Sequence, residues 1–198
     1  MQNGLQLNPD KSKAVFMGTA TQLRAVSSLT SVSVADVELP MADSMRVLGV
    51  TLDRRLTFDN HASAVARSCN YCARAIRHER HLLTLDLAQT LACSRILSRI
   101  DYCNFVLYGA PSGTIQKLQR VQNNAARIVL QAPRRSDVSS LLQTLHWLSV
   151  EQCINYKLAV LTFKTQQTSY PQYLNQHISL PSARNTRLSS VPLLCVPF

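Results

Sequence analysis

Residues 112–130 read SGTIQKLQRVQNNAARIVL, and this stretch predicts one helix with two unlike faces. At about 100° per residue, its aliphatic side chains fall within one arc of the helix. That apolar stripe consists of Ile115, Leu118, Val121, Ala125, Ile128 and Val129. The opposite side carries Lys117, Arg120, Asn124 and Arg127. Such a helix packs its stripe against other helices and turns outward a basic surface, which either contacts phosphates or is simply solvated.

The positive charge of the chain is concentrated in its middle third. The 198 residues are 46% hydrophobic and 16% charged, which suits one globular body or two small subdomains. Residues 1–53 hold 4 Lys/Arg against 5 Asp/Glu, residues 54–135 hold 13 against 4, and residues 136–198 hold 4 against 2. These balances of −1, +9 and +2 add up to the net charge of +10. A polyanion, either nucleic acid or an acidic membrane surface, is therefore the expected partner of the middle region.

The sequence carries no sign of membrane insertion or secretion. No apolar run reaches about 18 residues, and the N-terminal MQNGLQLNPDK lacks the hydrophobic core of a signal peptide. The six cysteines are not spaced like those of a secreted disulfide scaffold. We expect an intracellular protein, nuclear or cytoplasmic, with reduced thiols and no membrane partner.

One cysteine and histidine cluster superficially resembles a zinc site. Cys69, Cys72, His78 and His81 lack the separation of about 12 residues that lets two ligand pairs converge. If 58–80 is a helix, His78 projects roughly opposite Cys69, and both cysteines lie in the apolar stripe. The pattern therefore predicts buried structural thiols and no metal ligation.

The first 53 residues predict a small antiparallel sheet. Lys13–Met17 has the β-branched and aromatic bias of a short strand. Residues 29–34 and 37–39 indicate a hairpin, and Arg46–Asp53 a further strand with Gly49 as a bulge. We expect three or four strands in one sheet without a covering helix of its own.

From residue 58 onward the pattern is helical. The helix over 58–80 places Arg67 and Arg74 opposite its apolar stripe, with Arg77 at the margin. The next helix, from Thr84 to about residue 105, is apolar nearly all round and is expected to be the central, buried one.

The C-terminal third continues this helical pattern and then loses it. Residues 141–150 hold the only tryptophan, which predicts a packing corner, and residues 151–166 predict a last helix. From Pro171 the prolines and serines predict an extended tail, disordered over 179–198.

No catalytic constellation stands out among these residues. Asp36 and Glu38 are the only close carboxylate pair, and a hairpin pair of this kind is usually solvated surface. The phosphate-loop, nucleophile-elbow and zinc-protease motifs do not occur. The residues alone indicate an intracellular, mostly helical, basic protein associated with nucleic acid.

Several blocks of the sequence nevertheless resemble one family. LQLNPDKSK at 5–13 and VLGVTLD at 47–53, followed by Leu56, Phe58 and His61, resemble the end of the palm in reverse transcriptases of non-LTR (LINE-type, jockey-like) retrotransposons. Further blocks resemble the thumb and C-terminal segment of the same enzymes. They are SRIDYCN at 98–104, LQRVQNNAAR at 118–127, LHWL at 145–148, YKL at 156–158 and TFK at 162–164. The blocks occur in order and span nearly the whole chain.

The resemblance implies roles for particular positions. Lys11 matches a palm lysine near the nucleotide site, although a strand-edge lysine that serves solubility is the simpler interpretation. Leu48, Gly49 and Val50 match the primer-grip strand, where a glycine lets the primer terminus approach the backbone. The basic helices would lie along an RNA–DNA or RNA duplex and contact its phosphates. Their candidate contacts are Arg67, Arg74, Arg77, Lys117, Arg120, Arg127, Arg134 and Arg135.

The sequence also departs from the family. The aromatic-Ala-Asp-Asp block that holds magnesium in the intact enzyme is absent from these residues, so we expect it upstream, with the fingers and the rest of the palm. Lys13 stands where the family often has an acid, which leaves the surroundings of Lys11 uncertain. Ser149 stands where it often has proline, which we expect only to loosen a turn.

The expected architecture is α+β. A palm remnant over 1–57 precedes a thumb-like helical bundle over 58–132, C-terminal helices over 133–178 and the tail. We expect a C-terminal fragment of an RNA-directed DNA polymerase that does not polymerise by itself, with no cofactor of its own. The alternatives are a non-enzymatic nucleic-acid-binding module and a helical interaction remnant without activity.

Overall fold

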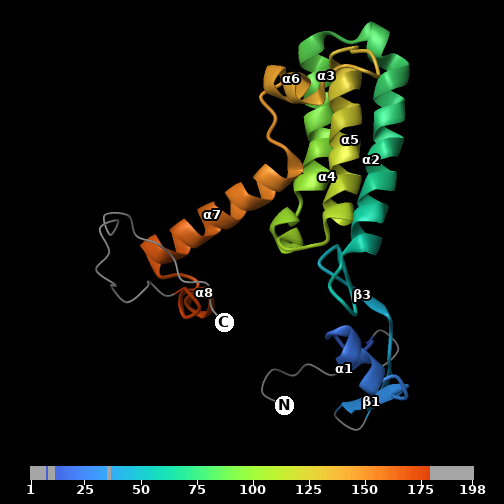
Figure 1. The fold of residues 1–198 in the computed structure, drawn as a ribbon, viewed down its shortest axis with the longest axis vertical. Helices are drawn as coiled ribbons and strands as arrows, with labels where there is room; N and C mark the ends of the chain where they lie inside the picture. Colours follow the sequence, from blue (N-terminus) through green and yellow to red (C-terminus); the bar gives the residue numbers. More distant parts are fainter. Residues whose placement is uncertain (1–7, 9–11, 35–36, 179–198) are drawn as a thin grey trace.

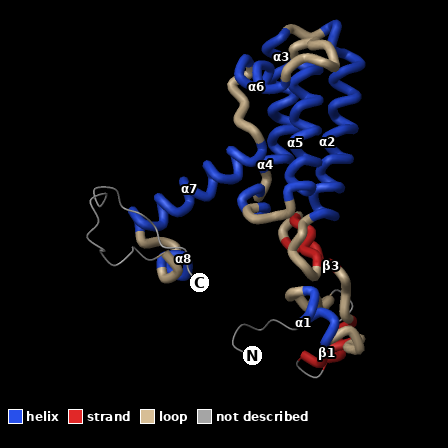
Figure 2. The backbone as a smooth tube through the Cα atoms, in the orientation of Figure 1, coloured by secondary structure: helices blue, strands red, loops and turns tan. Residues whose placement is uncertain are grey.

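The computed structural model describes residues 8, 12–34 and 37–178, and it has the expected α+β architecture. Two small hairpins and a short helix come first, and helices make up nearly all the rest (Figures 1 and 2). Lys11 and the predicted disordered tail over 179–198 lie outside the described residues. Among the described helices, none has the length and apolar character needed to cross a membrane.

The N-terminal region contains a helix that the sequence analysis did not predict. α1 (Ala20–Ala25) begins at Thr19, whose side chain accepts a hydrogen bond from the Gln22 amide while the Gln22 side chain accepts one from the Thr19 amide. This capping box satisfies two amides that the first turn leaves free. β1 (Ser31–Val34) then pairs antiparallel with β2 (Val37–Pro40), which confirms the predicted hairpin.

The predicted single strand over 46–53 is wrong. The chain forms a second antiparallel hairpin, β3 (Ser44–Val47) with β4 (Val50–Asp53), and turns at Leu48 and Gly49. Both turn residues have positive φ, 46° and 85°, as a two-residue turn between twisted strands requires. Gly49 is therefore a turn residue and not a bulge.

Two other expectations about the sheet are also wrong. The strands form two separate two-stranded sheets instead of one. The strand expected over 13–17 is reduced to a single bridge between Ala14 and Met41. Short hairpins close their own hydrogen bonds locally, so the sequence pattern does not require them to join.

The remaining helices form a bundle with one outlying helix (Figure 1). In chain order these elements are α2 (Asp59–Glu79), η2 (Arg80–Leu82), α3 (Leu85–Ala92), the π-helical η3 (Cys93–Leu97), α4 (Ser98–Asp101), η4 (Asn104–Leu107), α5 (Ser112–Val129), α6 (Val138–Thr144), α7 (Val150–Thr168) and α8 (Gln172–Asn175). The predicted helices over 58–80, 112–130 and 151–166 are confirmed to within one or two residues at each end.

The centre of the bundle is α5, and not the helix expected from Thr84 onward. α5 contacts α2, α3, α6 and α7, and it buries Leu118, Val121 and Val129. In α3, by contrast, Leu85 and Leu87 are 46% and 48% exposed. An apolar sequence on all sides is therefore not a sufficient sign of a central helix, because α3 is covered on one side only.

The C-terminal helices are only loosely covered. α7 extends away from the bundle (Figure 1), and its buried residues are Val150, Ile154 and Thr165. Ser149 caps α7 in a second capping box with Gln152, so the expectation that this serine only loosens a turn is wrong. Trp147 packs against both hydrophobic clusters, which confirms the predicted packing corner. The short helix α8 interrupts the segment expected to be extended from Pro171.

Candidate nucleic-acid interface

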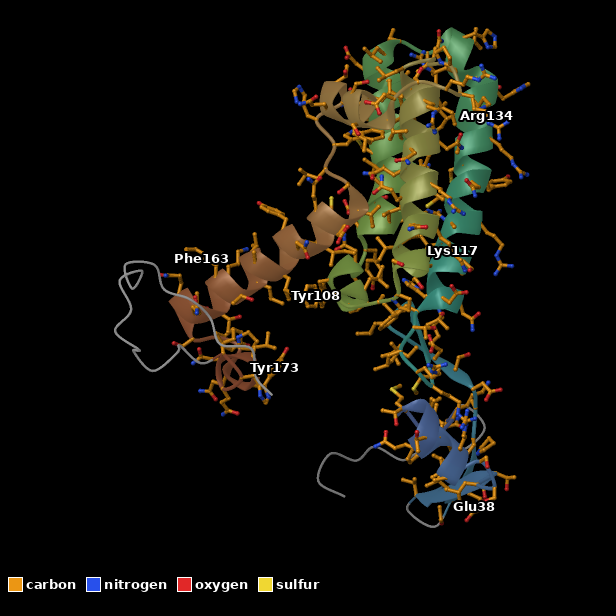
Figure 3. All side chains as sticks on the ribbon, viewed as in Figure 1. Glu38, Tyr108, Lys117, Arg134, Phe163 and Tyr173 are labelled. Carbon is orange, nitrogen blue, oxygen red and sulfur yellow. The ribbon has the colours of Figure 1, made fainter. Side chains whose placement is uncertain are left out.

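The polar faces of α2 and α5 meet in one exposed surface. The Lys117 Nζ of α5 donates to Asp59 Oδ1 at 2.6 Å and to Ser63 Oγ at 3.1 Å, both near the start of α2. Farther along both helices, Arg77 Nη2 donates to Asn124 Oδ1 at 2.8 Å. The two helices therefore run side by side in the same direction, and Lys117 lies beside α2 (Figure 3).

Three arginines on this surface point into solvent. Arg67 and Arg74 of α2 and Arg120 of α5 are exposed, and their side chains have no hydrogen-bond or ion-pair partner in the described part of the chain. An exposed guanidinium without a carboxylate partner is available to a phosphate. We call Arg67, Arg74 and Arg120 the exposed triad.

Lys117, which the sequence analysis grouped with these arginines, is in a different situation. Its ion pair with Asp59 compensates its charge and ties the start of α2 to α5. The sequence could not reveal this contact because the two residues are 58 positions apart.

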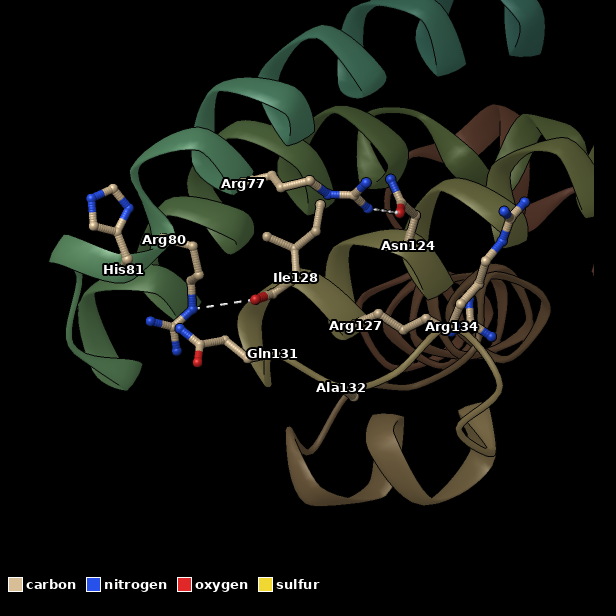
Figure 4. Close-up of a pocket in the computed structure, with 9 residues that line it drawn as sticks. All are labelled: Arg77, Arg80, His81, Asn124, Arg127, Ile128, Gln131, Ala132 and Arg134. Carbon is tan, nitrogen blue, oxygen red and sulfur yellow. Dashed lines mark hydrogen bonds between the residues drawn. The ribbon is translucent and has the colours of Figure 1, made fainter.

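At the far end of the same surface lies a cleft of about 830 Å³ (Figure 4). It is lined by Arg77, Arg80, His81, Asn124, Arg127, Ile128, Gln131, Ala132 and Arg134. We call it the arginine cleft, because four of these nine residues are arginines and none is a carboxylate. The fold thus brings Arg77, Arg127 and Arg134 together, while Arg135 is exposed outside the lining.

Arg80 builds the wall of the arginine cleft and was not singled out by the sequence analysis. Its Nε donates to the carbonyl oxygens of Ile128 at 3.2 Å and Val129 at 3.0 Å, and its Nη2 donates to Val129 at 2.7 Å. Its Nη1 donates to the Leu83 carbonyl at 2.7 Å. The residue four positions after Val129 is Pro133, which has no N–H, so Arg80 supplies the donor that the helix end lacks.

Arg127 has a hydrogen-bonding capacity that the protein does not use. Its Nε is buried and has no hydrogen-bond partner. Buried polar groups are usually paired, so this Nε is an exception in a residue that lines the cleft. The Arg77 guanidinium, in contrast, is oriented by Asn124 (Figure 4).

The predicted primer-grip residues occupy the tip of the β3–β4 hairpin. Leu48 is 84% exposed, and its carbonyl oxygen accepts a hydrogen bond from the Tyr102 hydroxyl at 2.8 Å. A Cβ at Gly49 would lie 3.4 Å from Tyr102 Cε1, an ordinary contact distance, so glycine is favoured here by the positive φ of 85° and not by lack of space. Val50 is buried in the main core. The hairpin tip is thus fixed to the helical bundle by Tyr102.

The base of the hairpin is fixed by Asp53 and His61. The Asp53 carboxylate accepts from the amides of Arg55 at 3.1 Å, Thr57 at 3.0 Å and Phe58 at 2.7 Å. Burial raises the pKa of Asp53, but these hydrogen bonds together lower it below its ordinary value. Burial and, secondarily, Arg46 lower the pKa of His61, whose Nδ1 accepts from the Thr51 amide at 3.4 Å.

A second cleft of about 440 Å³ separates this hairpin from α2 and α4. Its cationic lining residues are Arg46 and Arg99, and the Arg99 guanidinium donates to the Ser68 hydroxyl. Gly49 and Tyr102 line it as well, so the hairpin tip opens onto a positively charged cleft.

The prediction of buried thiols at Cys69 and Cys72 is confirmed for Cys69, whereas Cys72 is only partly buried. Cys69 is fully buried, and its Sγ donates to the Ile96 carbonyl at 3.6 Å. Burial raises the pKa of the Cys69 thiol to about 11. Cys72 packs partly buried against the same cluster, while His78 is exposed. Within the described ranges, no three His, Cys, Asp or Glu side chains are placed to hold a metal ion.

Comparisons with known proteins agree with the sequence resemblance at a coarse level. No protein-family model matches the chain, and no solved structure matches it. The chain is 27% identical over 158 residues to the probable RNA-directed DNA polymerase from transposon BS of Drosophila melanogaster. The match covers 76% of this chain and 17% of that protein. This similarity supports a relationship to the RNA-directed DNA polymerases of transposons.

Proposed function

We propose that this chain is the end of the palm and the thumb of an RNA-directed DNA polymerase from a non-LTR (LINE-type) retrotransposon. Residues 1–57 would belong to the palm, residues 58–132 would form the thumb, and residues 133–178 would continue it. Catalytic aspartates and their magnesium would come from an upstream part, so this chain would not polymerise DNA unaided. The similarity to a transposon polymerase supports this proposal.

The surface of α2 and α5 carries the proposed role in binding. Six arginines, the exposed triad with Arg77, Arg127 and Arg134 of the arginine cleft, lie on α2, on α5 and on the segment that follows α5. A nucleic-acid duplex presents a repeating row of phosphates, and cations along adjacent helices can follow such a row without reading its sequence. The β3–β4 tip, with Gly49 at its turn, would approach the primer terminus.

The test is a titration of the full chain with a blunt RNA–DNA hybrid at increasing salt. We expect the logarithm of the affinity to fall linearly with the logarithm of the salt concentration, because each contacted phosphate releases condensed counterions. The variant Arg67→Gln/Arg74→Gln/Arg120→Gln should bind more weakly and should flatten the slope by up to about 0.9 per lost contact.

A matched control removes three charges elsewhere. Arg24 on α1, Arg95 on η3 and Lys164 on α7 are exposed, and their side chains have no partner in the described part of the chain. Arg24→Gln/Arg95→Gln/Lys164→Gln should therefore leave binding nearly unchanged. Equal losses in both triple variants would mean that only net charge matters and would refute the assigned surface.

Two alternatives give different results in the same experiments. A non-enzymatic nucleic-acid-binding module would bind the hybrid, but the coding DNA upstream would contain no in-frame Ala-Asp-Asp block. A helical interaction remnant would give no salt-dependent binding at all.

A further inference from the structure

The arginine cleft differs from the rest of the basic surface in its shape and its charge. The exposed triad lies on open helix faces, whereas the cleft is hollowed between the ends of α2 and α5 and the segment 131–134 (Figure 4). Its volume of about 830 Å³ lies in the range of about 300–1,000 Å³ typical of ligand pockets. The backbone of a duplex can lie along an open helix face, whereas a cleft of this size can hold the end of a single strand.

We propose that the arginine cleft binds the terminal phosphate monoester of a nucleic-acid strand. This inference rests on the proposed function, since it assigns the end of the bound nucleic acid to one end of the α2–α5 surface. Arg77, Arg127 and Arg134 are the ligand-binding residues, and Arg80 is a positioning residue that holds the wall.

The charge of the site favours a monoester over an internal phosphodiester. The four arginines of the lining face no carboxylate, so their charge is not compensated within the cleft. A phosphate monoester carries a charge of about −1.5 to −2 at pH 7 and three terminal oxygens. An internal diester carries one negative charge, and its two ester links continue the chain in both directions, which an end-on hollow does not accommodate.

The site also holds hydrogen-bond donors that the protein does not use. The Arg127 side chain makes no hydrogen bond within the described chain, and the Arg77 guanidinium is held by Asn124 with its other N–H groups free to donate. Planar guanidinium groups bind phosphate oxygens in pairs. Arg134 is exposed beside them and can move onto a third oxygen.

The test compares one RNA–DNA hybrid in three forms, with a 5′-phosphate, with a 3′-phosphate or with hydroxyl groups at both ends. We expect one phosphorylated form to bind about tenfold more tightly than the hydroxyl form, the equivalent of one hydrogen bond to a charged group. The end that gives the gain identifies the strand polarity. Inorganic pyrophosphate should compete away this gain, since it supplies the same terminal phosphate oxygens.

The variants separate the cleft from the remaining surface. Arg77→Gln/Arg134→Gln should abolish the preference for the phosphorylated end. Arg67→Gln/Arg74→Gln also removes two positive charges, but outside the cleft, and should retain this preference. Arg134→Gln alone, at an exposed position, should reduce the preference even if the double variant fails to fold.

The outcomes distinguish the two proposals. A hybrid that binds equally with and without terminal phosphates overturns the inference but leaves the proposed function standing. A preference that survives Arg77→Gln/Arg134→Gln also overturns it. Absence of hybrid binding in every form refutes the proposed function, and the inference with it.

Discussion

Arg80 makes more side-chain hydrogen bonds than any other arginine in the described part of the chain, and its replacement should cost a large part of the stability. Arg80→Met keeps an unbranched apolar stem but removes the donors to Ile128, Val129 and Leu83. The Val129 carbonyl then has no helical donor, because Pro133 cannot supply one. Hydrogen bonds from charged groups contribute about 1.5–3 kcal/mol each, and three carbonyls lose a donor. Allowing for relaxation and water, we expect a loss of about 3 kcal/mol.

This loss is measurable by urea unfolding followed through the fluorescence of Trp147, the single tryptophan of the chain. Trp147 packs against both hydrophobic clusters, so its signal reports on the whole bundle. We expect the midpoint to fall with an unchanged dependence on denaturant, as a loss of stability alone requires. The unfolding midpoint of Arg80→Lys should lie between those of the unsubstituted chain and Arg80→Met, because a lysine ammonium can reach one carbonyl but not three.

The control is Arg74→Met on the same helix. Arg74 is exposed and its side chain has no partner among the described residues, so its replacement should change the free energy of unfolding by less than about 0.5 kcal/mol. If Arg80→Met is as stable as Arg74→Met, Arg80 is not what completes the end of α5, and the account of the cleft wall is refuted.

Three further predictions concern the hairpin and the core. Asp53→Asn should lower stability by about 1–2 kcal/mol at neutral pH. The pKa of Asp53 is lowered in the folded chain, so the difference in free energy of unfolding between the two proteins should be full above the unfolded pKa of about 3.9. It should shrink as the pH falls below that value, which unfolding curves measured across this pH range can show. Gly49→Ala should cost about 1–2 kcal/mol because φ is +85°, whereas Gly113→Ala, with open space around its Cβ, should cost nothing in the same assay. Cys69 should resist alkylation at pH 8 in the folded chain and react in urea, as mass spectrometry can show, because its thiol is buried and its pKa is raised to about 11; modification of the folded chain at Cys69 would contradict its assigned place in the core.

The sequence predicted the helices well because their evidence is local. α2, α5 and α7 each carry apolar residues at helical spacing, and the basic faces of α2 and α5 follow from the same periodicity. Both capping boxes have a local sequence signature, Thr19-x-x-Gln22 and Ser149-x-x-Gln152. This spacing marks the start of α1, which the apolar periodicity does not reveal, and it agrees with the start of α7.

The parts of the site that escaped prediction depend on contacts between distant residues. Arg80 looks like an ordinary last-turn cation of α2, and only the fold places it against Val129, 49 positions away. Helical periodicity likewise does not reveal that Lys117 is ion-paired while Arg120 is unpaired, because the partner of Lys117, Asp59, comes from another helix. Similarly, Gly49 inside an apolar run does not reveal whether the chain bulges or turns back.

The contacts of the cations change what the net charge means. Residues 54–135 hold 13 Lys and Arg, and five of them, Arg54, Arg77, Arg80, Arg99 and Lys117, donate to other groups of the chain. The eight others, 13 minus 5, have side chains without a partner in this fully described range. Among the bonded five, Arg77 keeps unused N–H donors in the arginine cleft, while Arg95, one of the unbonded eight, lies at a control position outside the assigned surface. Eight cations are therefore able to meet phosphates, and at about 0.9 per phosphate duplex DNA binding by this region should not show a salt slope steeper than about −7. A steeper slope would require contacts from outside residues 54–135 and would refute the view that this region alone holds the nucleic acid.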